Sequence, residues 1–294
     1  MPIKDNNFQH FIEAGKRAKE VRAYGKSLIV KGASYKDVTA KIRQKIKELD
    51  AIPAFPPQIA LNETAAHFLP SPDEEIIFKD ELIKLDIGVC YKGAIGDCAV
   101  TIDLGGKHQK LINAVEAALL AAEKIIEVGL PIQEIGRVIE ETIHSFGLKP
   151  IENLTGHGLG NYCVHKAPMI PNCFHPMREK IEPGMTFAIE PFATDGFGAV
   201  YEKGRPEIFS LTQHRYPLNP QAKAFIRQIK EMQGLPFELA DLRGEGKEKV
   251  VNYLLRKRIL TGYPPLVEEG NGMVAQAENS VLVDLDGSVT ITTR

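Results

Sequence analysis

An internal repeat constrains the fold of this chain more than any other feature. Sliding the sequence against itself by 97 positions aligns residues 32–53 with residues 129–150 without a gap. Both copies contain a glycine break, a short turn and apolar residues three or four positions apart, which is the period of an amphipathic helix. Another helical pattern precedes each copy, over roughly 8–30 and 107–128. Helical segments can resemble one another by chance, so the repeat needs support from outside the helices.

The repeat continues beyond the helices. At an offset of 98 the segment around His67 aligns with that around His165, and at an offset of 104 the segment around Asp86 aligns with that around Glu190. Each half is therefore predicted to contain two helices, a segment with a histidine, and an apolar strand with a carboxylate. We expect an α/β (α+β) fold of two pseudo-symmetric halves whose carboxylate strands converge on one central site.

The second half contains an insertion. Asp97 follows Asp86 by 11 residues across a tight turn, whereas Glu278, the matching partner of Glu190, lies 88 residues downstream. The intervening residues, roughly 203–264, contain helical patterns of their own, which is typical of a small subdomain. The predicted domains are a main domain that carries the site, residues 1–202 and 265–294, and an inserted helical subdomain, residues 203–264.

Two aspartates lie within what reads as a buried β-hairpin, residues 85–104. If the hairpin turns at Lys92–Gly93, Asp97 lies opposite Gly88, and Asp86 projects from the same face as a diagonal neighbour. Two ionised carboxylates on an apolar face repel each other and lose hydration, so a cation between them is one interpretation. A solvated edge strand is the other, and the hairpin alone does not separate the two.

The two halves would bring four acidic side chains together, and such a cluster is untenable at neutral pH without cations. These acids are Asp86, Asp97, Glu190 and Glu278. The segment 154–165 supplies nitrogen donors, His157 between two glycines and His165 eight residues later. Four carboxylates and one histidine suit two divalent ions, Mn²⁺, Fe²⁺ or Co²⁺ at least as well as Zn²⁺. Paired metals polarise a carbonyl and activate a bridging water, so the set indicates hydrolysis.

Other interpretations of these segments have less support. The glycines of 156–160 lack the G-x-G-x-x-G spacing of a phosphate loop, and the acidic helix at 140–144 lacks the second histidine of H-E-x-x-H. The four cysteines show no C-x-x-C spacing, and free thiols fit a reducing compartment. A thiolate ligand from Cys98 or Cys163 stays open as an alternative.

Composition excludes some broad classes of function. The 36 Lys and Arg residues nearly balance the 38 Asp and Glu residues, which gives no general electrostatic argument for binding nucleic acid or membranes. The N-terminus is polar and helical rather than a signal peptide, and no apolar run approaches a membrane span. We expect a cytoplasmic protein without membrane or specific nucleic-acid partners.

Taken in order, the motifs resemble those of methionine aminopeptidases with the pita-bread fold. The resembling segments cover nearly the whole chain from Phe55 to Asp284: FPPQIALNETAAHFLP, LDIGV with IGDCAVT, TGHGLGNYCVHKAPMIPN, FAIEPFAT and AENSVLV. The insertion resembles the winged-helix-like subdomain of the type II class, which occurs in archaea and eukaryotes. The short N-terminus is more similar to the archaeal form.

The resemblance implies a metal-dependent hydrolase that removes N-terminal methionine when the second residue is small, by attack of water activated by two divalent ions (Co, Mn, Fe or Zn). In this family pattern Asp86 chelates one metal, Asp97 and Glu278 bridge, and His157 with Glu190 completes the other. Glu190 would also shuttle a proton. The implied substrates are nascent polypeptide N-termini, and a monomer with a transient ribosome association is expected.

The resemblance also implies residues that contact the substrate. His67 and His165 correspond to two family histidines that contact the substrate and its tetrahedral intermediate, so they join Glu190 as catalytic candidates. The candidates for the methionine pocket are Phe55, Pro56, Val164 and Ile208. Plain core packing is the alternative for these four, because apolar side chains are commonly buried for no other reason.

Two competing functions share this pattern. A prolidase or aminopeptidase P-like X-Pro peptidase has the same fold and a similar metal set, but the insertion and the AAHF segment at 65–68 argue against it. A non-catalytic relative that binds ribosomes or RNA would use the insertion, with the basic run at 256–258, as a partner surface. The presence of all five ligands argues against that function, and the basic run reads as a solvated helix face.

Overall fold

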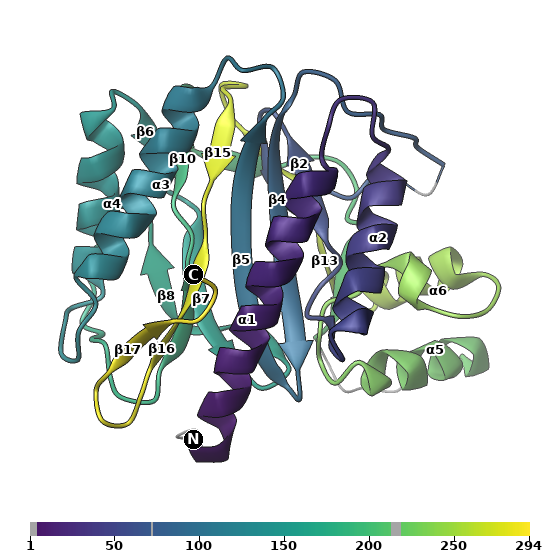
Figure 1. The fold of residues 1–294 in the computed structure, drawn as a ribbon. Coiled ribbons are helices and arrows are strands. Elements are labelled where there is room, and N and C mark those ends of the chain that lie inside the picture. Colours follow the sequence, from purple (N-terminus) through teal and green to yellow (C-terminus); the bar gives the residue numbers. More distant parts are fainter. Residues whose placement is uncertain (1–4, 72, 213–218) are drawn as a thin grey trace.

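The computed structural model describes residues 5–71, 73–212 and 219–294. Two helix pairs flank a central set of strands, and a third, smaller pair lies at one side (Figure 1). The α-helices of the described residues are α1 (Asp5–Leu28), α2 (Tyr35–Glu48), α3 (Gln109–Lys124), α4 (Gln133–Ser145), α5 (Pro220–Glu231) and α6 (Lys247–Arg256). None of these helices combines the length and apolar character that crossing a membrane requires.

The first half is a sheet covered by α1 and α2. Its strands are β1 (Ile52–Pro53), β2 (Gln58–Leu61), β4 (Leu82–Tyr91) and β5 (Ala94–Asp103), and β4 pairs with the other three. Buried side chains of α2 repeat every three or four residues and pack with those of β4 in one apolar cluster. The predicted hairpin register is confirmed, since Gly88 pairs with Asp97 and Tyr91 with Ala94.

The second half repeats this plan with α3 and α4 as its covering helices. Its strands are β6 (Lys149–Pro150), β7 (Thr155–Gly160), β8 (Cys163–Pro171), β9 (Thr186–Ile189), β10 (Phe192–Thr194), β15 (Val274–Gln276), β16 (Asn279–Val283) and β17 (Val289–Ile291). One sheet has the order β17-β16-β9-β7-β8, and a shorter one has the order β15-β10-β6. The antiparallel pairs β9·β16 and β10·β15 form one interrupted hairpin, which corresponds to β4·β5.

Backbone hydrogen bonds confirm the internal repeat. The N–H of Gly32 donates to the carbonyl of Phe78 at 2.8 Å, and the N–H of Gly129 donates to the carbonyl of Ile181 at 2.8 Å. Both glycines have positive φ, 85° and 89°, a conformation that glycine adopts without the steric cost of a Cβ. The glycine break is therefore the turn that leads into the second helix of each pair.

The insertion begins and ends in the antiparallel pair β12 (Ile208–Leu211) and β13 (Leu260–Tyr263). Between them lie α5, a short 3-10 helix (Leu239–Asp241) and α6, which share an apolar cluster of their own with the strands. The residues are therefore not purely helical. A three-stranded sheet borders this insertion and consists of β11 (Val200–Glu202), β14 (Leu266–Glu268) and β3 (Thr64–Ala66). That residues 203–264 form a separate subdomain remains a prediction.

Candidate active site

The two halves meet along a seam between their carboxylate hairpins. The backbones of Ala99 and Glu278 exchange hydrogen bonds, N–H of Glu278 to the Ala99 carbonyl at 3.2 Å and N–H of Ala99 to the Glu278 carbonyl at 3.4 Å. Asp97, two residues from Ala99, lies at the same seam, where its N–H donates to Ser280 Oγ of the second half at 2.8 Å. The interruption between β9 and β10 places Glu190 on the other side of the same seam.

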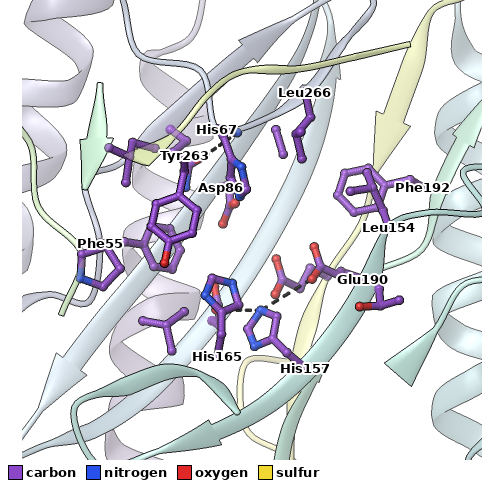
Figure 2. Close-up of a pocket in the computed structure, with 18 of the residues that line it drawn as sticks. Phe55, His67, Asp86, Leu154, His157, His165, Glu190, Phe192, Tyr263 and Leu266 are labelled. Carbon is purple, nitrogen blue, oxygen red and sulfur yellow. Dashed lines mark hydrogen bonds and ion pairs between the residues drawn. The ribbon is translucent and has the colours of Figure 1, made fainter. Parts of the chain in front are cut away.

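All five predicted metal ligands line one cavity of about 200 Å³. Figure 2 shows His157 and Glu190 facing each other across its floor, with His157 Nε2 3.5 Å from Glu190 Oε1. His157 Nε2 also lies 3.9 Å from Asp97 Oδ2. Asp97, His157 and Glu278 each offer one donor atom within 4.8 Å of the others, which is close enough to share an ion.

The donor set fits divalent metal ions. Burial raises the pKa of Asp86 to about 7, and burial together with the neighbouring carboxylates raises the pKa of Asp97, Glu190 and Glu278 well above the ordinary range. Among the buried polar atoms without a hydrogen-bond partner are Asp86 Oδ1, Asp97 Oδ1 and His157 Nδ1. Buried carboxylates are costly unless they are paired or coordinate a metal. A bound cation would supply the missing charge and partners.

The three histidines of the cavity are neutral near pH 7. Burial lowers the pKa of His157 to about 3 and that of His67 to about 4, and it also lowers the pKa of His165. Neutral imidazole keeps the lone pair that a metal or a substrate N–H requires. His67 lies just after β3 and His165 lies in β8, and the rings of His157 and His165 have centroids 4.3 Å apart.

The apolar residues of the predicted methionine pocket are divided between two cavities. Phe55, Val164 and Ile208 line the cavity with the acids. Pro56 does not, and instead lines an adjacent cavity of about 360 Å³ that also contacts Phe55. Both residues lie in the bend between β1 and β2, where Phe55 contacts both cavities and Pro56 only the adjacent one.

Several lining residues were not predicted from the sequence. These are Gln58, Ala66, Asn153, Leu154, Thr155, Phe192, Pro236, Tyr263 and Leu266. Gln58 lies three residues after Phe55 in one of the matching motifs, so its position carried a signal. Tyr263 lies at the end of the insertion, where the pairing of β12 with β13 places it opposite Ile208. Leu266 follows the insertion in β14 and pairs with Ala66 of β3.

Comparison with known proteins identifies the class. Residues 9–284 match metallopeptidase family M24, and the chain belongs to this family. Within the family the sequence is similar to archaeal methionine aminopeptidases. It is 39% identical to that of Archaeoglobus fulgidus over 294 residues (99% of this chain, 100% of that protein) and 39% identical to that of Methanocaldococcus jannaschii over 290 residues (98% of each).

Solved structures confirm the pita-bread fold. Methionine aminopeptidase from Thermotoga maritima superposes with a TM-score of 0.74 at 22% identity, covering 100% of this chain and 99% of that one. A thermophilic Arx1 gives 0.83 at 15% identity (99% and 91%), and the prolidase from Pyrococcus furiosus gives 0.64 at 17% identity (100% and 65%). These likenesses show a shared fold, whereas the sequence relatives separate the aminopeptidases from the prolidases.

Proposed function

We propose that this chain removes the N-terminal methionine from proteins and peptides whose second residue is small. The single observation that carries the proposal is the convergence of the four carboxylates and His157 on one cavity, beside an apolar wall, in a chain 39% identical to methionine aminopeptidases. We propose two divalent ions held by Asp86, Asp97, His157, Glu190 and Glu278. The type II assignment rests on the insertion between Glu190 and Glu278.

Each group of side chains has a role in this reaction. The bound metals would polarise the scissile carbonyl and lower the pKa of a water molecule. The Glu190 carboxylate, whose Oε2 accepts a hydrogen bond from Gln276 Nε2 at 3.3 Å, takes the proton from that water and returns it to the leaving amine. His67 and His165 contact the substrate backbone as neutral rings. The methionine side chain packs against Phe55, whose neighbours in the cavity include Val164 and Ile208.

The cavity is small and lined by four acidic residues, which explains why the enzyme would accept only the N-terminal end of a peptide. The free amine of the substrate is attracted to the carboxylates, while the unbranched thioether of methionine adapts to an irregular apolar wall. A bulky second side chain would clash near His165. N-acetylation removes the charged amine, so an acetylated peptide is a poor substrate.

The test is methionine release from a panel of peptides by one metal-loaded preparation. We expect hydrolysis of Met-Ala-Ser and Met-Gly-Ser, and little or none of Met-Lys-Ser, Met-Phe-Ser or N-acetyl-Met-Ala-Ser. Equal cleavage of the acetylated peptide would exclude an exopeptidase, and preference for X-Pro peptides with other first residues would indicate a prolidase. Metal content per chain, measured before and after adding single metals, tests the proposed number and identity of the ions.

We further propose that a monomer acts on nascent chains in the cytoplasm and contacts the ribosome transiently. Residues 203–264 contain 12 Lys and Arg against 6 Asp and Glu, whereas the rest of the chain contains 24 against 32. A basic insertion on an acidic protein favours contact with a polyanion such as ribosomal RNA. Co-sedimentation with ribosomes at two salt concentrations tests this. Ribosome binding without any peptide cleavage would support the non-catalytic alternative.

A further inference from the structure

His67 has a backbone conformation that needs support. Its φ is +59°, in the left-handed region, which side chains other than glycine adopt at a cost and which persists when surrounding contacts fix it. The residue follows the last position of β3, Ala66, so its N–H lies beyond the ladder of that strand. That N–H donates instead to the side-chain oxygen Oε1 of Gln58 at 2.8 Å.

Gln58 connects His67 to the strand that carries a predicted metal ligand. It lies in β2 directly opposite Asp86 of β4, and both residues line the cavity. Only 6% of Gln58 is exposed. A buried polar side chain in a strand interior is costly unless it is hydrogen-bonded, and the bond to His67 supplies that partner. Gln58 therefore connects the strand pair that carries Asp86 with the backbone of His67.

The imidazole ring of His67 is fixed from the opposite side. The backbone carbonyl of Pro264 acts on the ring and partly opposes the lowering of the pKa of His67 by burial. The ring also meets the ring of Tyr263 edge to face, with centroids 5.6 Å apart. Figure 2 shows the rings of His67 and Tyr263 next to each other. Gln58 of the first half thus holds the backbone of His67, and Tyr263 of β13 packs against its ring.

We infer that Gln58 is a positioning residue that holds His67 at the working distance from the substrate. The inference rests on the proposed function of His67. Without the Oε1 acceptor, the N–H of His67 loses its partner and the left-handed backbone loses its support. The ring would then be held only by its packing against Tyr263 and could shift, and displacements near 1 Å can reduce turnover about 10²-fold.

The variant Gln58→Met tests this with little change in volume. We expect kcat for Met-Ala-Ser to fall roughly 10- to 10²-fold, with KM, metal content and thermal midpoint close to those of the wild type. Gln58→Glu keeps an acceptor oxygen at the same place but adds an acid opposite Asp86, so we expect it to retain more activity than Gln58→Met at equal metal content. Gln44→Met, on the exposed face of α2, is the matched control and should change none of these quantities.

A double-mutant cycle with His67→Ala identifies the route of the effect. If Gln58 acts through His67, Gln58→Met has no further effect on kcat in the His67→Ala background. Losses that multiply in the double variant, or a metal content reduced by Gln58→Met alone, would overturn the inference in favour of an effect on Asp86 or on packing.

Hydrogen exchange at the His67 amide supplies a readout independent of activity. We expect slow exchange in the wild type and in Gln58→Glu, and fast exchange in Gln58→Met. Equal exchange in all three would show that Gln58 does not hold the His67 backbone. If His67→Ala keeps wild-type turnover while the His67 amide of the parent protein exchanges slowly, the proposed function of His67 is wrong. The failure of the inference and the failure of the proposed function are therefore distinguishable.

Discussion

The hydroxyl group of Ser280 bonds to both backbone groups of Asp97. Ser280 Oγ accepts from the N–H of Asp97 at 2.8 Å and donates to its carbonyl at 2.8 Å. Thr101 makes the same pair of bonds in the opposite direction, donating to the carbonyl of Gln276 at 2.6 Å and accepting from its N–H at 2.8 Å. Each half therefore provides one buried hydroxyl group, which bonds to the backbone N–H and carbonyl of a strand residue in the other half.

Removal of either hydroxyl should weaken the seam between the halves. Ser280→Ala and Thr101→Val each leave a buried N–H and a buried carbonyl without this partner, which costs about 1–3 kcal/mol per unsatisfied group. We expect lower free energies of unfolding in urea for both variants and a weaker metal affinity for Ser280→Ala, because Asp97 is a proposed ligand. Ser145→Ala, at an exposed hydroxyl of α4, serves as the control. Unchanged stability of both seam variants would contradict this account.

Much of the architecture could be predicted because the signals within each half come from residues that are close together in the sequence. Helical periods, glycine breaks and alternation around a tight turn depend on neighbouring residues, and the pairing of Gly88 with Asp97 followed from the turn alone. The pairing of Glu190 with Glu278 needed the analogy between the halves, since no local signal connects residues separated by an insertion. His157 has no counterpart in the repeat, and its role as a ligand was expected from the resemblance to methionine aminopeptidases.

Positions that depend on tertiary packing could not be predicted. Pro56 and Phe55 belong to one motif, yet in the bend between β1 and β2 Pro56 lines only the adjacent cavity. Gln58 resembles any polar residue at a strand end until His67 adopts a positive φ beside it. Tyr263 reaches the cavity because β12 pairs with β13, which is a contact between residues more than fifty positions apart.

His157 is the only nitrogen donor among the proposed ligands. His157→Ala should abolish methionine release and reduce metal occupancy, because the remaining donors are four carboxylates that repel one another. Metal content after dialysis, measured by mass spectrometry of the elements, and peptide cleavage are the two readouts. His144→Ala, at the exposed end of α4, is the control. Near-normal activity of His157→Ala would refute its assignment as a ligand.

Metal removal should make stability depend on pH. Burial raises the pKa of Asp86 to about 7 and raises the pKa of Asp97, Glu190 and Glu278 further above the unfolded values. Above the ordinary carboxyl range the four acids of the metal-free folded state hold protons that the unfolded state has lost, so their contribution to stability falls as pH rises. The lowered pKa of His67, His157 and His165 opposes this fall only until the unfolded imidazoles lose their protons near pH 6.5. We expect the chelated protein to have a lower thermal midpoint at pH 8 than at pH 5.5.

The metal-loaded protein is the control for this pH series. Bound cations replace the protons, so its thermal midpoint should change much less over the same range, and the difference between loaded and chelated protein should be larger at pH 8. Parallel pH profiles with and without chelator would show that the carboxylate cluster is not a metal site.

Arg43 of α2 joins the first half to the insertion. Its guanidinium forms ion pairs with Glu238 and with Asp241, the latter at 3.0 Å, and these groups are largely buried. Burial raises the pKa of Glu238, and Arg43 opposes this rise. Arg43→Met should therefore reduce the free energy of unfolding by about 1–2 kcal/mol at pH 8. The loss should be smaller at pH 5, where Glu238 can take up a proton in the folded state.

Hydrogen exchange can locate the effect of this variant. Arg43→Met should accelerate exchange in residues 235–243, where Pro236 lines both the active-site cavity and the adjacent one. We expect a higher KM for Met-Ala-Ser, because the wall near Phe55 loosens, with metal content unchanged. Arg227→Met, at an exposed position of α5, provides the control for loss of one positive charge from this region. A pH-independent loss of stability equal in both variants would exclude Glu238 as the partner responsible.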